Sequence, residues 1–256
     1  MTRTVLDKEL RQLEEQITQM GNLVEHSLTQ VLDALETGNQ DESDEVIMSD
    51  NAIDDLCMII EEHVFRVLTL QQPLAGRDLR YITSLLPIAI DLERIGDDSE
   101  GIAQYILRMA PFQRKTAQEE QGSAPPADTV EAHEQPTEET ILKDLLQLGH
   151  DVWQALQDTM NAFTQRDANA ARTLWAQDRM IDRRSSRINR HLMEMIEGPQ
   201  AIAALEHDPH VLQRATYLLW ISYKLERIAD HCTNICERIA FIVEGETDIR
   251  PRPEPG

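Results

Sequence analysis

Cysteines, aromatic residues and long apolar runs are all scarce in this sequence. Its 3 cysteines are an odd number and lack the spacing of a disulfide framework, which is typical of a protein in a reducing cytosol. The densest apolar segments, such as residues 85–90, are about a third of the length that a membrane-spanning helix requires. The amino-terminal residues run into a charged segment and not into the apolar core of a signal peptide. These absences predict a cytoplasmic protein that does not insert into a membrane.

Basic residues are also scarce relative to acidic ones. Lysine and arginine number 24 against 46 aspartates and glutamates, which gives a formal net charge of −22. Because nucleic acid and anionic membrane surfaces would repel such a chain, we expect neither as a partner. The charge instead favours solubility, cations and basic partner surfaces.

Several enzyme signatures are missing as well. The sequence contains no P-loop, no glycine-rich nucleotide loop and no nucleophile elbow. It also lacks the Glu-x-x-His motif of ferritin-like di-iron oxidases. We therefore expect a regulator or adaptor and not an enzyme.

What the sequence does contain is helical periodicity along most of its length. Only 4% of residues are aromatic and β-branched runs are rare, which predicts an all-α fold. Chain breakers separate the segments: Gly38 ends the first, Pro73 precedes the third, and Asp208 with Pro209 marks the start of the last. Pro87 falls inside the third segment and is expected to kink it. The predicted helices cover residues 5–37, 41–70, 76–109, 138–166, 168–197 and 209–244.

A compositional change divides these helices into two sets of three. Residues 110–137 are rich in proline, glutamate and glutamine, which predicts an acidic flexible linker. Residues 245–256, in which residues 250–255 alternate charged residues with proline, are expected to be a disordered tail. The predicted domains are therefore residues 5–109 and 138–244.

The two sets of helices are related by an internal repeat. At an offset of 128 residues Asp50 matches Asp178, Asp54 matches Asp182, and His63 matches His191. In the third helix of each half the offset is 133, where residues 92–97 (LERIGD) match residues 225–230 (LERIAD). Shared spacing across long helices predicts two tandem three-helix bundles that arose by duplication.

Both halves carry two acid-x-x-x-acid pairs, one on the second helix and one on the third. The pairs are Asp50/Asp54 and Glu93/Asp97 in the first half, and Asp178/Asp182 and Glu226/Asp230 in the second. Residues four apart share a helix face, and like charges there repel unless a cation lies between them. If antiparallel neighbours bring the pairs level, four carboxylates converge on a site suited to Mg²⁺, Mn²⁺, Ca²⁺ or Fe³⁺. The alternatives are solvated acidic edges, or ion pairs with Arg94 and Arg227.

Three other groups of residues in the second half have more than one interpretation. Cys232 and Cys236 fall on the apolar stripe of the last helix and are expected to be core thiols and not metal ligands. His231 follows Asp230 and is a candidate additional ligand. A local basic run either docks an acidic partner or pairs with acids on neighbouring helices. This run comprises Arg183, Arg184, Arg187 and Arg190.

The repeated signature resembles that of the phosphate-uptake regulator (PhoU) family of phosphate-specific transport accessory proteins. The resemblance rests on residues 92–97, on residues 225–231, and on Gln72–Ala75 followed by Asp78–Arg80. It extends from about residue 5 to residue 244, excluding the linker. The resemblance implies a pair of three-helix bundles that bind metal, with iron, zinc, manganese and magnesium as the candidate ions. The implied ligands are Asp50, Asp54, Glu93, Asp97, Asp178, Asp182, Glu226, Asp230 and Asn234.

The same resemblance implies negative regulation of phosphate uptake and of the phosphate-starvation response. The implied partners are the ATPase subunit of a phosphate transporter and a membrane sensor histidine kinase. Separately, a homodimer is expected. Two rival functions remain at this point: a metal-dependent hydrolase or phosphatase, and a helical scaffold without metal.

The chain also departs from the family signature, which continues through a histidine, an asparagine and a glutamate. The second half keeps these residues as His231, Asn234 and Glu237, whereas the first half has Asp98, Gly101 and Gln104. The metal preference of the first half is therefore open. The long linker, and the absence of the proline-led motif near residues 203–206, are further departures.

Overall fold

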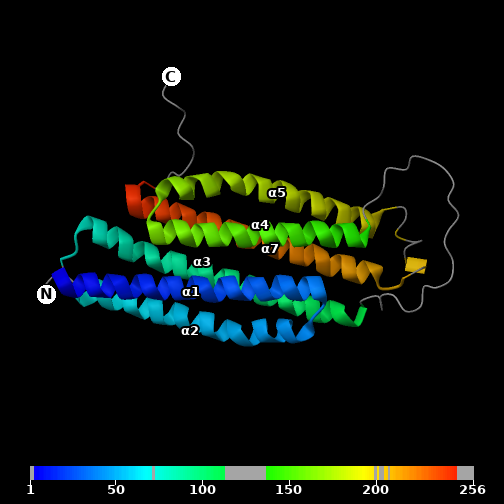
Figure 1. The fold of residues 1–256 in the computed structure, drawn as a ribbon, viewed down its shortest axis with the longest axis horizontal. Coiled ribbons are helices and arrows are strands. Elements are labelled where there is room, and N and C mark those ends of the chain that lie inside the picture. Colours follow the sequence, from blue (N-terminus) through cyan, green and yellow to red (C-terminus); the bar gives the residue numbers. More distant parts are fainter. Residues whose placement is uncertain are drawn as a thin grey trace, which may run out of the picture.

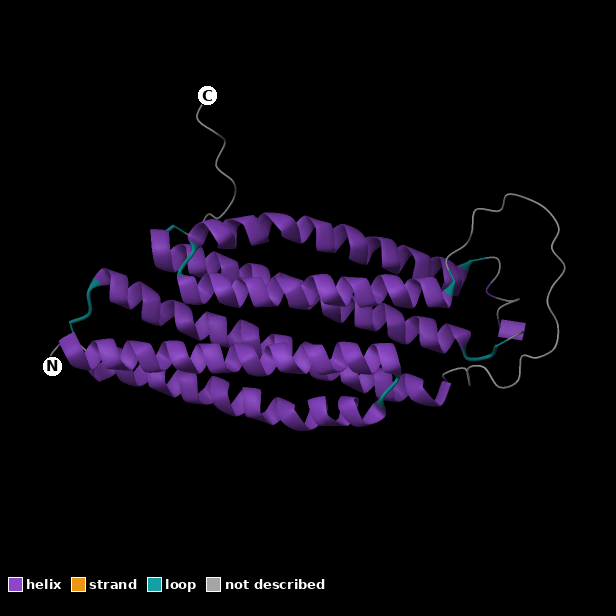
Figure 2. Cartoon of the chain, in the orientation of Figure 1, coloured by secondary structure: helices purple, strands orange, loops and turns teal. Residues whose placement is uncertain are grey.

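The chain folds into long helices, as the periodicity predicts. The computed structural model describes residues 3–70, 73–112, 137–198, 201, 205–206 and 208–246, and these contain helices and short loops but no strand (Figure 2). The all-α prediction is confirmed. The elements are α1 (Arg3–Thr37), α2 (Gln40–Leu70), α3 (Gly76–Met109), the 3₁₀ helix η1 (Ala110–Phe112), α4 (Glu138–Gln165), α5 (Ala168–Glu197) and α7 (Val211–Glu244).

Local chemistry explains where several helices begin and end. Gly38 ends α1 with a positive φ of 72°, and Arg166 takes the same left-handed conformation after α4. Asp167 caps α5, because its carboxylate accepts the backbone amides of Asn169 and Ala170 at 2.9 and 3.0 Å. α7 begins at Val211, two residues later than predicted, because Asp208 bonds the amide of His210 in a turn before the helix. Helix α3 continues through Pro87.

The helices form two three-helix bundles that lie side by side along the long axis of the molecule (Figure 1). α1, α2 and α3 pack together in the first half, and α4, α5 and α7 pack together in the second. The halves meet where α1 contacts α4 and α3 contacts α7, while α2 and α5 lie on opposite outer edges. Two tandem bundles related by duplication are therefore confirmed.

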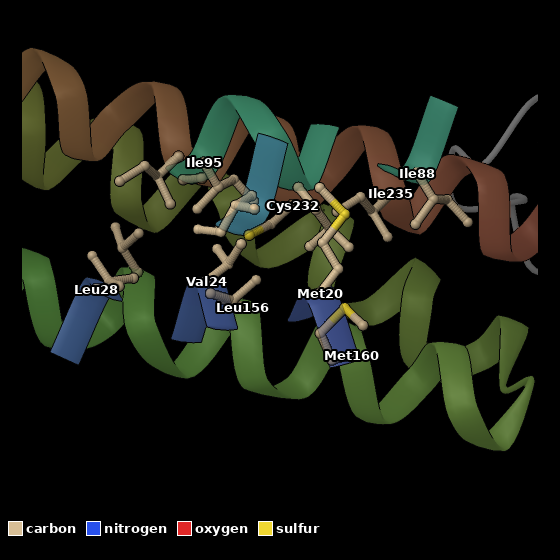
Figure 3. Close-up of a cluster of buried hydrophobic side chains, with 14 of the residues drawn as sticks. Met20, Val24, Leu28, Ile88, Ile95, Leu156, Met160, Cys232 and Ile235 are labelled. Atoms are coloured by element: carbon tan, nitrogen blue, oxygen red, sulfur yellow. The ribbon is translucent and has the colours of Figure 1, made fainter. Parts of the chain in front are cut away.

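A single hydrophobic core runs through both halves. Val24 of α1 lies beside Leu156 of α4, and Ile95 of α3 lies close to Cys232 of α7 (Figure 3). These side chains are almost fully buried. Cys232 and Cys236 are both buried in this core, so their predicted role as packing residues is confirmed.

Two repeat-equivalent glycines allow α1 and α4 to approach closely. A Cβ atom on Gly21 of α1 would collide with Met160 of α4, and a Cβ atom on Gly149 of α4 would collide with Leu32 of α1. Gly21 and Gly149 are 128 residues apart, as are Leu32 and Met160. The two contacts are therefore the same contact made twice, which gives this interface a local twofold symmetry.

Arg214 holds the chain together where the first half leads into the second. Its side chain is only 3% exposed. It donates two hydrogen bonds to the carboxylate of Glu138 at 2.6 and 2.7 Å, one to Asp208 at 2.7 Å and one to the carbonyl of Phe112 at 2.8 Å. A buried bidentate guanidinium–carboxylate pair is among the stronger protein contacts. It joins the 3₁₀ helix after α3 and the start of α4 to the start of α7.

Some predictions concern residues outside the described ranges. These include residues 113–136 of the predicted linker, residues 247–256 of the predicted tail, Gln72 of the proline-led motif, and residues 203 and 204 of its counterpart. Among the described residues, no helix combines the length and apolar character needed to cross a membrane.

Candidate metal centre

The first acidic cluster lies between α2 and α3. Asp50 and Asp54 are one turn apart on the side of α2 that faces Asp97 of α3. Oxygen atoms of the three carboxylates all lie within 4.8 Å of one another. Gly96 permits this approach, because a Cβ atom there would lie 3.0 Å from Oδ1 of Asp50. Asp97 is exposed, whereas the two α2 aspartates are partly buried.

The second acidic cluster repeats this arrangement between α5 and α7. Asp178 and Asp182 of α5 meet Asp230 of α7, again with oxygen atoms within 4.8 Å of one another. Its members are the repeat equivalents of the first cluster, and their burial follows the same order. The structure thus places the acids of neighbouring helices on one side of each bundle, as the spacing predicted.

The two glutamates of the signature lie beside the clusters and differ in their surroundings. In the second half Ser185 donates a hydrogen bond of 2.6 Å to Glu226. The equivalent of Ser185 is Cys57, whose thiol lies near Glu93; burial and then this negative charge raise the pKa of Cys57 to about 11. Glu226 is therefore engaged by a hydroxyl, whereas Glu93 faces a thiol that stays protonated at neutral pH.

Burial and mutual repulsion raise carboxylate pKa values in both clusters. Burial, followed by the charges of Asp54, Glu100, Asp97 and Glu93, raises the pKa of Asp50 to about 7. Burial, followed by the charges of its cluster neighbours and Glu226, raises the pKa of Asp178 to about 6. The same two causes raise the pKa values of Asp97 and Asp230. A cation held between the carboxylates would relieve this repulsion.

The donor atoms in the clusters suit a hard cation. One buried oxygen of Asp54 and one of Asp178 have no hydrogen-bond partner in the described part of the chain, and orphaned buried acceptors are costly unless something binds them. No lysine or arginine forms an ion pair with any of the six cluster aspartates, as far as the described residues extend. Carboxylate-only sites fit magnesium, manganese, calcium or iron better than zinc, which prefers nitrogen and sulfur ligands.

The structure does not support the alternative in which Arg94 and Arg227 neutralise the signature acids. Arg94 points instead to Asp91, at 4.0 Å, and Arg227 points to Asp98, at 3.3 Å. Both aspartates are buried on the side of α3 that faces α7. The arginines therefore make their ion contacts in the interface between the halves, and only their more distant charge acts on Glu93 and Asp230.

His231 and Asn234 also turn toward that interface. Nδ1 of His231 lies 2.9 Å from a carboxylate oxygen of Asp91, and the amide of Asn234 donates to the same oxygen at 3.3 Å. His231 is buried there, so the interpretation of His231 as an additional ligand beside Asp230 is not supported. Asn234 lines a surface depression together with Asp230, and its role as a ligand stays a prediction.

This interface explains why the first half departs from the family signature. Lys224 of α7 donates a hydrogen bond of 2.7 Å to Asp98 of α3. A Cβ atom on Gly101 would lie 2.9 Å from the lysine Nζ, so glycine makes room for this contact. Asp98 and Gly101 replace the histidine and asparagine that the second half keeps. At these two positions the first half therefore has residues that accommodate and bind Lys224 of the second half.

Sequence reasoning missed this polar interface, although one signal was available. Lys224 and His231 on α7 are the repeat equivalents of Asp91 and Asp98 on α3. The Lys224–Asp98 contact and the His231–Asp91 contact therefore occupy equivalent places, with acids on one side and bases on the other. Opposite charges at equivalent positions of a duplicated helix indicate that the two copies face each other.

The second cluster borders a cavity of about 430 Å³ between α4, α5 and α7. Asp178 lines it, and Arg184 crosses its wall to reach Asp151 at 2.9 Å. The equivalents of Arg184 and Asp151 in the first half are Leu56 and Leu23, which pack against the core. The second half therefore has an ion pair near its cluster where the first half has two leucines.

Comparisons with known proteins agree with the duplication. A family model described as the PhoU domain matches the chain twice, at residues 17–106 and 145–239. The phosphate-specific transport system accessory protein PhoU homolog 1 of Thermotoga maritima is 30% identical over 94% of this chain and 89% of its own length. A PhoU homolog of Clostridium acetobutylicum is 27% identical over 96% of this chain and 97% of its own.

Two crystal structures resemble the fold over nearly its whole length. The phosphate transport system regulatory protein PhoU from Streptococcus pneumoniae matches with a TM-score of 0.74 and 26% identity, covering 95% of this chain and 99% of that one. PhoU from Pseudomonas aeruginosa matches with a TM-score of 0.75 and 26% identity, covering 94% and 99%. The likeness therefore includes both bundles and their relative placement.

Proposed function

Because the chain belongs to the PhoU family, we propose that it is an accessory regulator of phosphate uptake that acts through protein contacts and carries metal ions at its two acidic clusters. The observation that carries the metal part is geometric. Three carboxylates from two helices converge within 4.8 Å, and they do so twice, at repeat-equivalent positions. Duplication has preserved six repelling charges, which is costly unless a cation is bound.

We propose magnesium, manganese or iron as the metal, because each cluster offers only carboxylate oxygens. Asp50, Asp54 and Asp97 would hold it in the first half, with Glu93 beside them. Asp178, Asp182 and Asp230 would hold it in the second, where Glu226 is already bonded to Ser185. A bound metal would supply positive charge and open coordination positions for phosphate oxygens.

The proposed regulation is negative and scaffold-like. Relatives described as phosphate-specific transport accessory proteins support a role beside the transport machinery. We propose that exposed helical faces hold the transporter ATPase subunit, or a membrane sensor kinase, in an inhibited state when phosphate is abundant. Such contacts require a cytoplasmic location, which also suits three free cysteines.

A regulator fits the geometry better than the rival hydrolase. Asp97 and Asp230, which complete the two clusters, are both exposed. A site open to water on the outside of a bundle has little means of excluding solvent from a reaction. Metal-dependent phosphate release by the purified protein that is lost on Asp230→Ala substitution would favour the hydrolase instead.

Phosphate uptake in living cells tests the regulatory proposal. Deleting the gene should leave uptake unrestrained in high phosphate, and the wild-type gene should restore the restraint. The double variant Asp97→Asn/Asp230→Asn should fail to restore it, because each cluster loses a charged ligand. The control Asp33→Asn/Glu36→Gln removes two exposed acids of α1 and should restore it fully. Normal uptake in the deletion strain would refute the proposal.

A further inference from the structure

The outer face of α5 carries a row of arginines that the fold does not use. Arg184 turns inward to Asp151, which fits the prediction that the basic run pairs with acids on neighbouring helices. The other arginines of that run do not pair in this way. Arg183, Arg187 and Arg190 are exposed and, with exposed Arg179, form what is called here the α5 arginine row. None of these four side chains forms an ion pair within the described part of the chain.

The equivalent face of α2 carries the opposite charges. Asp55 matches Arg183, Glu62 matches Arg190, and Arg66 matches Glu194, all at the offset of 128 residues. These three α2 residues are exposed, as are their counterparts on α5. Asp55 and Glu62 form no ion pair among the described residues, and Arg66 contacts only Glu9.

Apolar side chains lie among these charges on both helices. Phe65 of α2 is 54% exposed and its equivalent on α5, Met193, is 38% exposed. Ile59 of α2 is 50% exposed and matches Arg187, whose aliphatic stem can cover an apolar neighbour. Placed side by side in the same direction and register, the two helices would oppose unlike charges and pair apolar groups over about 16 Å.

We propose that α5 of one molecule docks on α2 of a second copy. The occupant is another copy because this chain itself presents unlike charges at three equivalent positions, 55/183, 62/190 and 66/194. A polyanion such as duplex nucleic acid could contact the arginine row too, but it offers no apolar group to pair with exposed Met193 and no cation to face Glu194. Two copies with net charge −22 also repel each other, but at physiological salt this repulsion is largely screened beyond about 8 Å, whereas ion pairs in contact are screened less.

The contact is heterologous and does not close on itself. α2 and α5 lie on opposite outer edges of the molecule (Figure 1), so one copy can use both faces at once with two different neighbours. Association of this kind builds open assemblies that lengthen with protein concentration. In this proposal the expected homodimer is the smallest of a series of assemblies that grow by one copy at a time.

Sedimentation velocity of the full-length protein, at rising concentration and at physiological ionic strength, tests the proposal. The weight-average mass should rise past that of two chains. It should fall toward one chain in high salt, because exposed ion pairs are screened. A wild-type protein that stays at one chain throughout overturns the proposal.

Charge reversal on either face identifies the surface. Arg183→Glu/Arg190→Glu should lower the association constant at least about tenfold, the effect of losing two ion pairs and gaining repulsion. Asp55→Arg/Glu62→Arg should do the same from the other face. The control Arg11→Glu/Arg108→Glu changes the net charge by the same amount at exposed positions elsewhere, and should associate like the wild type.

Mixing the two reversed variants gives the sharpest result. Each variant alone opposes like charges, but in the mixture every α5 of one finds a complementary α2 of the other. Association should therefore return to within a few fold of the wild-type constant. Circular dichroism of each variant checks that these exposed substitutions leave the helices intact. Wild-type association in either variant alone, or no recovery on mixing, would place the contact elsewhere and overturn the proposal.

Discussion

The two halves share their acidic clusters but differ in almost everything around them. The negative charge of Glu100 acts on the first cluster, and the equivalent residue in the second half is Thr233. Gly96 packs against Asp50 in the first half, where the second half has Ala229. Near the second cluster, the charges of His231 and Arg227 partly offset the raised pKa of Asp230. Duplication therefore kept the carboxylates, while each half adapted their electrostatic setting.

A second difference is that the halves diverged to complement each other. Acids on α3 face bases on α7 at equivalent positions of the inner interface. Unlike charges likewise occupy equivalent positions on the outer helices α2 and α5. A pair of identical halves would oppose like charges at both places, so the reversal favours the pairing of unlike halves.

The largest expected effect on stability comes from breaking the contact between Lys224 of α7 and Asp98 of α3. Lys224→Ala leaves Asp98, which is 1% exposed, without its closest cation, and should lower the free energy of unfolding by about 3 kcal/mol. His231→Ala removes the equivalent contact to Asp91 and should cost only about 1 kcal/mol, because one hydrogen bond is lost while Asn234 still donates to the same carboxylate oxygen. Urea unfolding measures both. Equal costs would show that the two contacts are not differentiated by charge.

A somewhat smaller effect should come from the close approach of α1 and α4. Gly21→Val and Gly149→Val each force a side chain into the opposite helix and should each cost roughly 2 kcal/mol, the usual penalty for overpacking. The two costs should be similar because the contacts are repeat equivalents. Gly76→Ala is the control, since no atom lies within 4 Å of the added Cβ. Thermal unfolding of the three variants would reveal an asymmetric interface if the two valines differed widely.

The smallest effect concerns pH and separates the two clusters. In the metal-free protein the pKa of Asp50 is raised to about 7 and that of Asp178 to about 6. The folded state therefore binds more protons than the unfolded state between about pH 4 and these values, and stability should fall as the pH rises through that window. The loss should be on the order of 1–2 kcal/mol after solvent screening.

Neutral variants assign that pH dependence to each half. Asp50→Asn should remove the part that extends to about pH 7, and Asp178→Asn the part that ends near pH 6. The measurement is the melting temperature of chelator-treated protein between pH 5 and pH 8. Stability that rises over this range, in the wild type relative to both variants, would contradict the raised pKa values.

Much of the fold follows from the sequence because helical periodicity and chain breakers are local signals. Gly38 and Asp167 end or begin helices through their own backbone and side-chain chemistry. The clusters were predictable because each half carries an acid pair on both its second and its third helix, and these helices are antiparallel neighbours. The later start of α7 was not predictable, because Asp208 accepts a hydrogen bond from the amide of His210 and so stabilises a turn before the helix.

The directions of His231 and Arg184 could not be read from one helix alone. His231 follows Asp230 in the sequence but points to Asp91 on the other half. Arg184 belongs to a basic run, yet it alone pairs with Asp151 on α4. Both outcomes depend on which helix lies opposite, and that is a property of the packing between elements and not of the local pattern.

Titration of the metal-free protein with manganese, followed by electron paramagnetic resonance, most directly tests whether the duplicated carboxylate clusters are cation sites. The wild-type chain should bind two classes of manganese, with the class in the first half more strongly weakened by acid. Asp97→Asn should remove one class, Asp230→Asn the other, and the double variant both. Manganese binding that is absent from the wild type, or undiminished in the double variant, would contradict the account.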